Sequence, residues 1–176
     1  MPTVVPRSAA DRDSFWSIPR SVPSRAWEAT WLRLVDQFIN CDSFTLYKAV
    51  EDGVPAVVVE YISRALNQPT PEVLVIIGLP ETRYRRKLEA GEALPDAAGH
   101  RAVALMRVSA KLWQLLAESG DPREVAEFNV DAWVSTWINA PLPELGGSTP
   151  AALLRNPDGQ RVVETLLERM RGGLAA

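Results

Sequence analysis

Residues 137–174 read WINAPLPELGGSTPAALLRNPDGQRVVETLLERMRGGL, and this stretch indicates the fold more clearly than any other part of the chain. Its Gly146-Gly147 pair permits a turn at positive φ. Thr149-Pro150 and Asn156-Pro157 each combine a capping side chain with a proline suited to the first turn of a helix. Apolar residues then recur at helical spacing along residues 163–174. The stretch therefore predicts a helix end, a glycine turn, a short helix and a long final helix.

The same pairing of a cap residue with a proline occurs upstream of this stretch. Thr70-Pro71 and Asp121-Pro122 repeat the cap and proline pattern, and they predict further helix starts. Apolar stripes with a period of three to four residues run along residues 27–38 and 102–116, and no alternating strand pattern lies between them. The predicted class is all-α, with helices of ordinary globular length.

Composition restricts the kinds of function. The 176 residues include 19 basic and 22 acidic side chains, for a net charge of -3, so any attraction to nucleic acid has to be local. One cysteine, Cys41, and one histidine, His100, exclude a disulfide framework and a zinc site of the usual four Cys or His ligands. We expect no metal and no cofactor.

Segments and motifs of other classes are missing from the sequence. It has no apolar run long enough for a membrane span and no signal peptide, which favours a cytoplasmic protein. It has no glycine-rich phosphate loop and no serine nucleophile elbow. His100, which follows Gly99, is interpreted as a helix-entry residue rather than a general base. We therefore expect a protein that is not an enzyme and has no catalytic residue.

Residues 1–25 are rich in proline, serine and arginine, a composition that cannot build a core of its own. We interpret them as a flexible arm. Phe15 and Trp16 are the exception, because two adjacent aromatic residues in such a segment often dock on a neighbouring surface, either in the same chain or in a partner.

Residues 54–90 resemble a helix-turn-helix. The pattern predicts a helix over Val54–Leu66, a polar turn, a short helix over Pro71–Ile77, a turn at Gly78 and a last helix from Pro80 to Ala90. The last helix is basic and is where phosphate contacts would lie. Its candidate DNA-binding residues are Thr82, Arg83, Tyr84, Arg86 and Lys87.

A simpler interpretation of this basic helix is a solvated surface, since consecutive side chains on a helix point in different directions. Arg83 and Lys87 share a face and have Tyr84 beside them, which makes these three the better candidates for DNA contact. Arg86 could instead pair with Glu89.

The C-terminal stretch resembles the toxin-binding domain of the Xre/MbcA/ParS antitoxins. The order and spacing of several short motifs carry this resemblance. They are Trp137-Ile138-Asn139, Leu142-Pro143, Leu145-Gly146-Gly147 with Thr149-Pro150, Leu153-Leu154, Gly159, Val162-Val163, Leu166-Leu167, Arg169-Met170 and Gly172. Members of this family commonly carry an Xre-like helix-turn-helix upstream, to which Gly53-Val54-Pro55 and Arg85-Arg86 are similar. Arg155-Asn156-Pro157 departs from the family, where a threonine often follows the Leu-Leu pair, and residues 1–40 match nothing in it.

The resemblance implies an antitoxin that neutralises a RES-type toxin, similar to ADP-ribosyltransferases, which consumes NAD or transfers from it. It implies that the final helix and tail cover the toxin's active site. A terminal carboxylate and an arginine suit such a site, and apolar side chains would supply buried contact. The implied toxin-binding residues are Leu167, Arg169, Met170, Arg171, Gly172, Gly173, Leu174, Ala175 and Ala176. The simpler interpretation is a frayed C-terminus.

The sequence thus predicts an arm over residues 1–25, a helical region over 26–119 that holds the helix-turn-helix and dimerisation helices, and a toxin-binding domain over 120–176. A DNA-binding homodimer would repress its own operon, and its dimer surface is expected among the Trp27/Trp31 helix and the helix over 102–116. The predicted partners are the toxin, in a hetero-oligomer, and operator DNA. The alternatives are a helix-turn-helix regulator without a toxin and a toxin-binding module whose basic helix no longer touches DNA.

Overall fold

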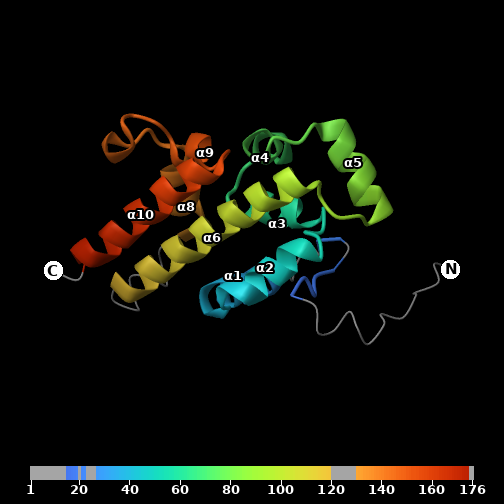
Figure 1. Ribbon diagram of the computed structural model, residues 1–176, viewed down its shortest axis with the longest axis horizontal. Coiled ribbons are helices and arrows are strands. Elements are labelled where there is room, and N and C mark those ends of the chain that lie inside the picture. Colours follow the sequence, from blue (N-terminus) through green and yellow to red (C-terminus); the bar gives the residue numbers. More distant parts are fainter. Residues whose placement is uncertain (1–14, 20, 23–26, 120–129, 175–176) are drawn as a thin grey trace.

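The computed structural model describes residues 15–19, 21–22, 27–119 and 130–174, and these ranges hold helices and no strand (Figure 1). The predicted all-α class is confirmed. The helices are α1 (Trp27–Asn40), α2 (Ser43–Glu51), α3 (Val58–Ala65), α4 (Thr70–Ile77), α5 (Glu81–Ala90), α6 (Asp96–Ser119), α8 (Val130–Asn139), the 3-10 helix η2 (Pro143–Leu145), α9 (Pro150–Leu153) and α10 (Pro157–Leu174).

Helix α6 forms the centre of the molecule. It packs against α1, α2, α3, α4, α8 and α10, and it crosses the middle of the view in Figure 1. Leu105 and Leu112 have no exposed surface. Ser109 is also buried, and its hydroxyl is satisfied there because it donates a hydrogen bond to the carbonyl of Leu105. The apolar stripe predicted over residues 102–116 therefore marks a core helix.

The predicted helix caps have different outcomes. Thr149 and Asn156 each accept a hydrogen bond from a backbone amide three residues later, as predicted, at 3.2 and 2.8 Å. The prediction for Thr70 is wrong. Helix α4 begins at Thr70 itself, and the Thr70 hydroxyl contacts the Ser63 hydroxyl instead of capping. Asp121 lies outside the described residues.

The aromatic pair near the N-terminus docks on the protein's own core. Trp16 is buried, its indole N–H donates to the Ala49 carbonyl at 2.7 Å, and its ring contacts Phe15 and Phe38. Ile18 is also buried. Of the segment interpreted as an arm, this part belongs to the folded core because its apolar side chains find a site between α1 and α2.

The predicted first helix of the 54–90 region is shorter than expected. Residues 54–56 pair with the segment after α5 instead of extending α3. Leu94 donates to the Val54 carbonyl at 2.7 Å and Ala56 donates to the Glu92 carbonyl at 3.1 Å. This pairing, with a bridge between Pro55 and Ala93, ties down the chain on both sides of α5.

The surface expected to form a dimer is covered only in part within one chain, since Trp27 is half-buried and Leu32, on the same helix, is 46% exposed. Trp31 of α1 is only 2% exposed, and α6 is surrounded by other helices. A tryptophan-rich pattern marks apolar burial, but it does not distinguish a core from an interface.

Candidate functional site

The final helix α10 is seated on α9 through a close backbone approach. Gly159, in the first turn of α10, lies against the backbone of Leu153, and a Cβ at this position would collide with the Leu153 carbonyl. Asn156 caps the amide of Gly159, and the Gln160 side chain donates to the Leu154 carbonyl at 3.1 Å. The glycine that begins the final helix is therefore needed for space.

The Leu145-Gly146-Gly147 turn needs glycine for a different reason. Gly146 and Gly147 have φ values of +63° and +79°, in the left-handed region, while a Cβ on either would meet nothing within 4 Å. Leu142 closes the turn, because its carbonyl accepts from Gly147 at 3.0 Å and its amide donates to Ser148 at 3.1 Å. The turn is thus a fixed scaffold beside α10.

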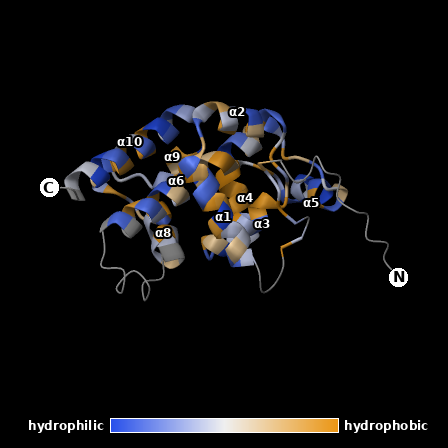
Figure 2. Cartoon of the chain, turned by 90° about the horizontal axis from the view of Figure 1, so that it is seen from below, coloured by the Kyte–Doolittle hydropathy of each residue, from blue (hydrophilic) through white to orange (hydrophobic). Residues whose placement is uncertain are grey.

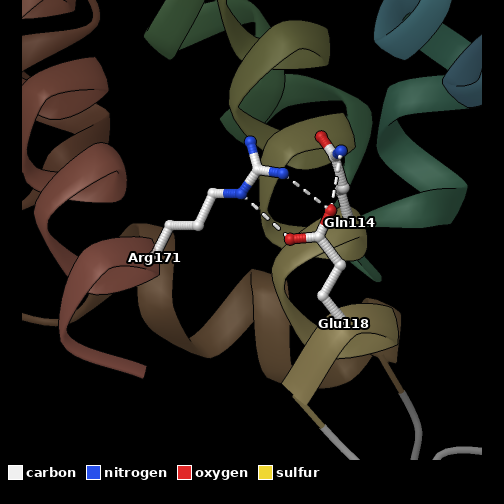
Figure 3. Close-up of polar contacts among 3 residues, drawn as sticks. All are labelled: Gln114, Glu118 and Arg171. Atoms are coloured by element: carbon white, nitrogen blue, oxygen red, sulfur yellow. Dashed lines mark hydrogen bonds and ion pairs between the residues drawn. The ribbon is translucent and has the colours of Figure 1, made fainter. Parts of the chain in front are cut away.

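Three ion pairs join α10 to α6 along one side. Arg107 pairs with Glu164 at 3.0 Å, and Lys111 lies 3.7 Å from Glu168. The third pair is bidentate: two guanidinium nitrogens of Arg171 donate to the two carboxylate oxygens of Glu118, each at 2.9 Å. Gln114 also donates to Glu118, as Figure 3 shows. We refer to these three ion pairs as the α6–α10 ladder.

The structure separates the predicted toxin-binding residues into two groups. Leu167 is 2% exposed and packs in the core, Met170 is half-buried, and Arg171 is engaged with Glu118. Arg169, Gly172 and Gly173 are exposed. Helix α10 extends through Leu174, whereas Ala175 and Ala176 lie outside the described residues. Leu167 and Arg171 therefore hold α10 in place, and the residues available to a partner begin at Arg169.

A shallow hollow of about 250 Å³ lies on the outer side of α10, beside the glycine turn. It includes Arg169 together with residues that the sequence did not single out as contacts, among them Leu145, Thr165 and Val162, which is 47% exposed. The Val162-Val163 pair in the sequence indicated an exposed valine, since only one of two consecutive helix residues can face the core. Val163 is the buried one.

The predicted DNA-binding residues of α5 also fall into two groups, one at least partly buried and one exposed. Tyr84 is 3% exposed, its hydroxyl has no hydrogen-bond partner, and burial raises its pKa. Lys87 is half-buried and pairs with Glu92 at 2.7 Å. Tyr84 thus attaches α5 to the protein as an apolar anchor, whereas Lys87 pairs with a residue just past the end of its own helix. Thr82, Arg83 and Arg86 remain on the exposed face.

The α5 helix stands at the edge of the molecule, away from α10 (Figure 1). It follows α4 after a turn in which Gly78 has φ +69°, and the guanidinium of Arg101 occupies the space that a side chain at Gly78 would need. Arg101 donates to the Ile77 carbonyl at 3.1 Å and to the Arg155 carbonyl at 2.7 Å. One side chain of α6 therefore joins the end of α4 to the segment between α9 and α10.

Among the described residues, no group of three or more histidine, cysteine, aspartate or glutamate side chains is arranged to hold a metal ion. Within the same ranges, no helix is both long and apolar enough to cross a membrane.

Comparison with known proteins shows a similarity to antitoxins that carry a toxin-binding domain. Residues 123–173 match the model of the antitoxin Xre/MbcA/ParS C-terminal toxin-binding domain. The chain is also 28% identical over 127 residues to a protein of Sphingobium sp. (strain YBL2), which is named "Prs ADP-ribosylating antitoxin". This similarity covers 72% of the chain and 78% of the relative. The C-terminal part of the chain is thus similar to the toxin-binding domain of the Xre/MbcA/ParS antitoxins.

Proposed function

We propose that this antitoxin neutralises a RES-type, ADP-ribosylating toxin by covering the toxin's active site with the end of α10 and the residues that follow. The observation that carries the proposal is the match of residues 123–173 to a toxin-binding domain. The name of the Sphingobium relative supports an ADP-ribosylating toxin as the partner. Nothing in this mechanism requires a catalytic group on the antitoxin, which acts by binding in a hetero-oligomer with the toxin.

In this mechanism one group of α10 residues fixes the position of the helix, and another group contacts the toxin. The α6–α10 ladder and buried Leu167 hold the helix at a fixed position, which lowers the entropy cost of presenting its end to a partner. Beyond Met170, Gly172 and Gly173 have no side chains that would prevent entry into a narrow cleft. Arg169 offers an exposed guanidinium for a carboxylate or another anionic group of the toxin.

Co-expression with the toxin encoded beside this gene tests the proposal. We expect the antitoxin to restore growth to cells that the toxin poisons. Removal of residues 172–176 or the substitution Arg169→Ala should weaken both the rescue and the affinity of the purified pair. The matched control is Lys48→Ala, which removes an exposed cation on α2, away from the end of α10. Full rescue by both altered proteins would contradict the active-site mechanism, and failure of the wild type would contradict the toxin partner.

A second activity, binding of operator DNA, is favoured by the exposed face of α5. Arg83 and Arg86 point away from the core on a helix that projects from the edge of the molecule. The helix follows α4 across a glycine turn, the arrangement in which a second helix can enter the major groove. We therefore include repression of its own operon by a homodimer in the proposed function, because a two-fold operator requires two such helices.

A further inference from the structure

Helix α10 has three sides with different surroundings. Val163 and Leu167 face the core and are buried. The residues of the α6–α10 ladder lie on one flank of this core-facing side. The other flank carries a stripe of residues at intervals of three and four, which share one face of the helix. They are Val162, Thr165, Leu166 and Arg169, and all four line the hollow beside the glycine turn.

The hollow combines apolar and cationic side chains. Leu145 of the turn and Val162 and Leu166 of α10 supply its apolar surface. Arg169 is exposed, and within the described ranges it forms no ion pair. At about 250 Å³ the hollow is smaller than a typical small-molecule pocket, which has about 300–1,000 Å³. It therefore suits a side chain of a protein partner better than a metabolite.

Two further charged residues line the hollow. Arg161 contacts Asp158 at 3.3 Å, but the two side chains are 80% and 91% exposed, so water screens this pair. Glu144 of η2 is the carboxylate of the lining, against the two arginines Arg161 and Arg169. The lining is thus net positive, which favours a partner surface that carries an acidic side chain.

We infer that the hollow is the anchoring site of the toxin, which places an apolar side chain between α10 and the glycine turn and an acidic side chain beside Arg169. A toxin is the occupant because every lining residue lies within residues 123–173, the range that matches a toxin-binding domain. Arg169 also belongs to the end of α10 that is proposed to reach the active site, so the two contacts are continuous. The inference rests on the proposed function, and it separates binding in the hollow from inhibition by the residues after Arg171.

The hollow is held in shape by contacts that lie outside it. The ladder fixes α10 from the opposite flank, and hydrogen bonds of Leu142 with Gly147 and Ser148 close the turn on the other side. A preformed site lowers the entropy cost of binding. Helices α10 and α5 lie toward opposite ends of the molecule in Figure 1 and Figure 2. A toxin anchored in the hollow therefore leaves the exposed face of α5 accessible.

Two substitutions in the hollow test the anchoring contact. Val162→Asn removes apolar surface, and Thr165→Trp places a large side chain in the hollow. Each should raise the dissociation constant for the purified toxin encoded beside this gene about 10- to 100-fold in calorimetric titrations. Both residues are exposed, so circular dichroism and urea denaturation should show an unchanged fold. The matched control is Val75→Asn, which changes a valine on α4 that is 61% exposed and should leave the dissociation constant unchanged.

The salt dependence of binding tests the acidic group of the toxin. Arg169→Ala should weaken binding and flatten its dependence on salt, because a charge pair is lost. Val162→Asn should weaken binding without changing that dependence. An unchanged salt dependence in Arg169→Ala would contradict the acidic side chain in the inferred contact.

Removal of residues 172–176 tests the separation of binding from inhibition. We expect the shortened protein to bind the toxin with a dissociation constant raised less than about 10-fold. It should nevertheless no longer block NAD consumption by the bound toxin. Val162→Asn should behave in the opposite way and inhibit fully once its concentration exceeds its higher dissociation constant.

The outcomes distinguish this inference from the proposed function. Unchanged affinity in both hollow variants would overturn the inference and leave the active-site mechanism in place. Binding lost on removal of residues 172–176 would also overturn it, because the tail would then be the anchor. Weak binding by the hollow variants together with full inhibition by the shortened protein would support the hollow and contradict the active-site mechanism. A wild-type protein that binds no toxin would contradict both.

Discussion

Helices α5 and α10 both carry several arginines, but they differ in what those arginines contact. On α10, Arg171 forms a bidentate pair with Glu118, and residues earlier in the same helix pair with Arg107 and Lys111 of α6. On α5, Arg83 and Arg86 face outward, and the helix is held by buried Tyr84. The face of α10 that packs on α6 has its charges in contact with that neighbour, whereas Arg169 stays exposed. On α5, Arg85 pairs with Glu81 of the same helix, and Arg83 and Arg86 remain available to a ligand.

The largest expected effect comes from disrupting the close contact between α10 and α9. Gly159→Ala places a methyl group against the Leu153 carbonyl, and this backbone cannot move without shifting α9. We expect a loss of about 2–3 kcal/mol in the free energy of unfolding, as for other overpacked sites. Urea denaturation measures it.

The control for this substitution is Gly172→Ala, in the last part of the same helix, where an added Cβ meets nothing within 4 Å. Its free energy of unfolding should stay the same or rise slightly, because alanine favours the helix. Equal losses in the two variants would show that the loss at Gly159 does not come from its contact with α9.

The exposed face of α5 should matter for DNA and little for folding. Arg83→Ala with Arg86→Ala is expected to lower operator affinity about 10- to 100-fold and to flatten its dependence on salt, since two phosphate or base contacts are lost. Fluorescence anisotropy at several salt concentrations measures both quantities.

Tyr84→Phe is the matched control on the same helix. It removes a hydroxyl that is buried and has no partner, so operator affinity should not change. Unchanged binding by the double arginine variant would leave α5 as a solvated surface and contradict the contrast with α10.

The sequence was informative where one local signal decides the structure. The cap at Thr149 and the helical class follow from short-range chemistry, and both were predictable. The roles of Leu167, Arg171 and Tyr84 were not, because each depends on which face of its helix another helix covers. The family resemblance implied a toxin contact for Arg171, but the packing of α6 against α10 pairs this arginine with Glu118. The groove between α2 and α6 depends in the same way on two helices far apart in the chain.

A smaller effect is expected from opening the α6–α10 ladder. Glu118→Gln removes the charge that Arg171 contacts, but both side chains are substantially exposed, at 42% and 59%, so water screens the pair. We expect the free energy of unfolding to fall by less than about 1 kcal/mol. Affinity for the toxin should change little if Arg171 acts only within the chain. A large gain in toxin affinity would instead show that Glu118 competes with the toxin for Arg171.

The smallest effect concerns the ion pair at the end of α5. The Lys87 ammonium, through a hydrogen bond and its charge, holds the pKa of Glu92 below its ordinary value of 4.5. Because the folded pKa is the lower one, the contribution to stability is complete at pH values above 4.5 and is lost as the pH falls through the lowered value. The difference in urea midpoint between the wild type and Glu92→Gln should therefore be present at neutral pH and shrink in acid. Since Glu92 is exposed, added salt should reduce the difference too. A difference that persisted in acid and in high salt would mean that the Glu92 side chain stabilises α5 through packing, as Leu167 does for α10.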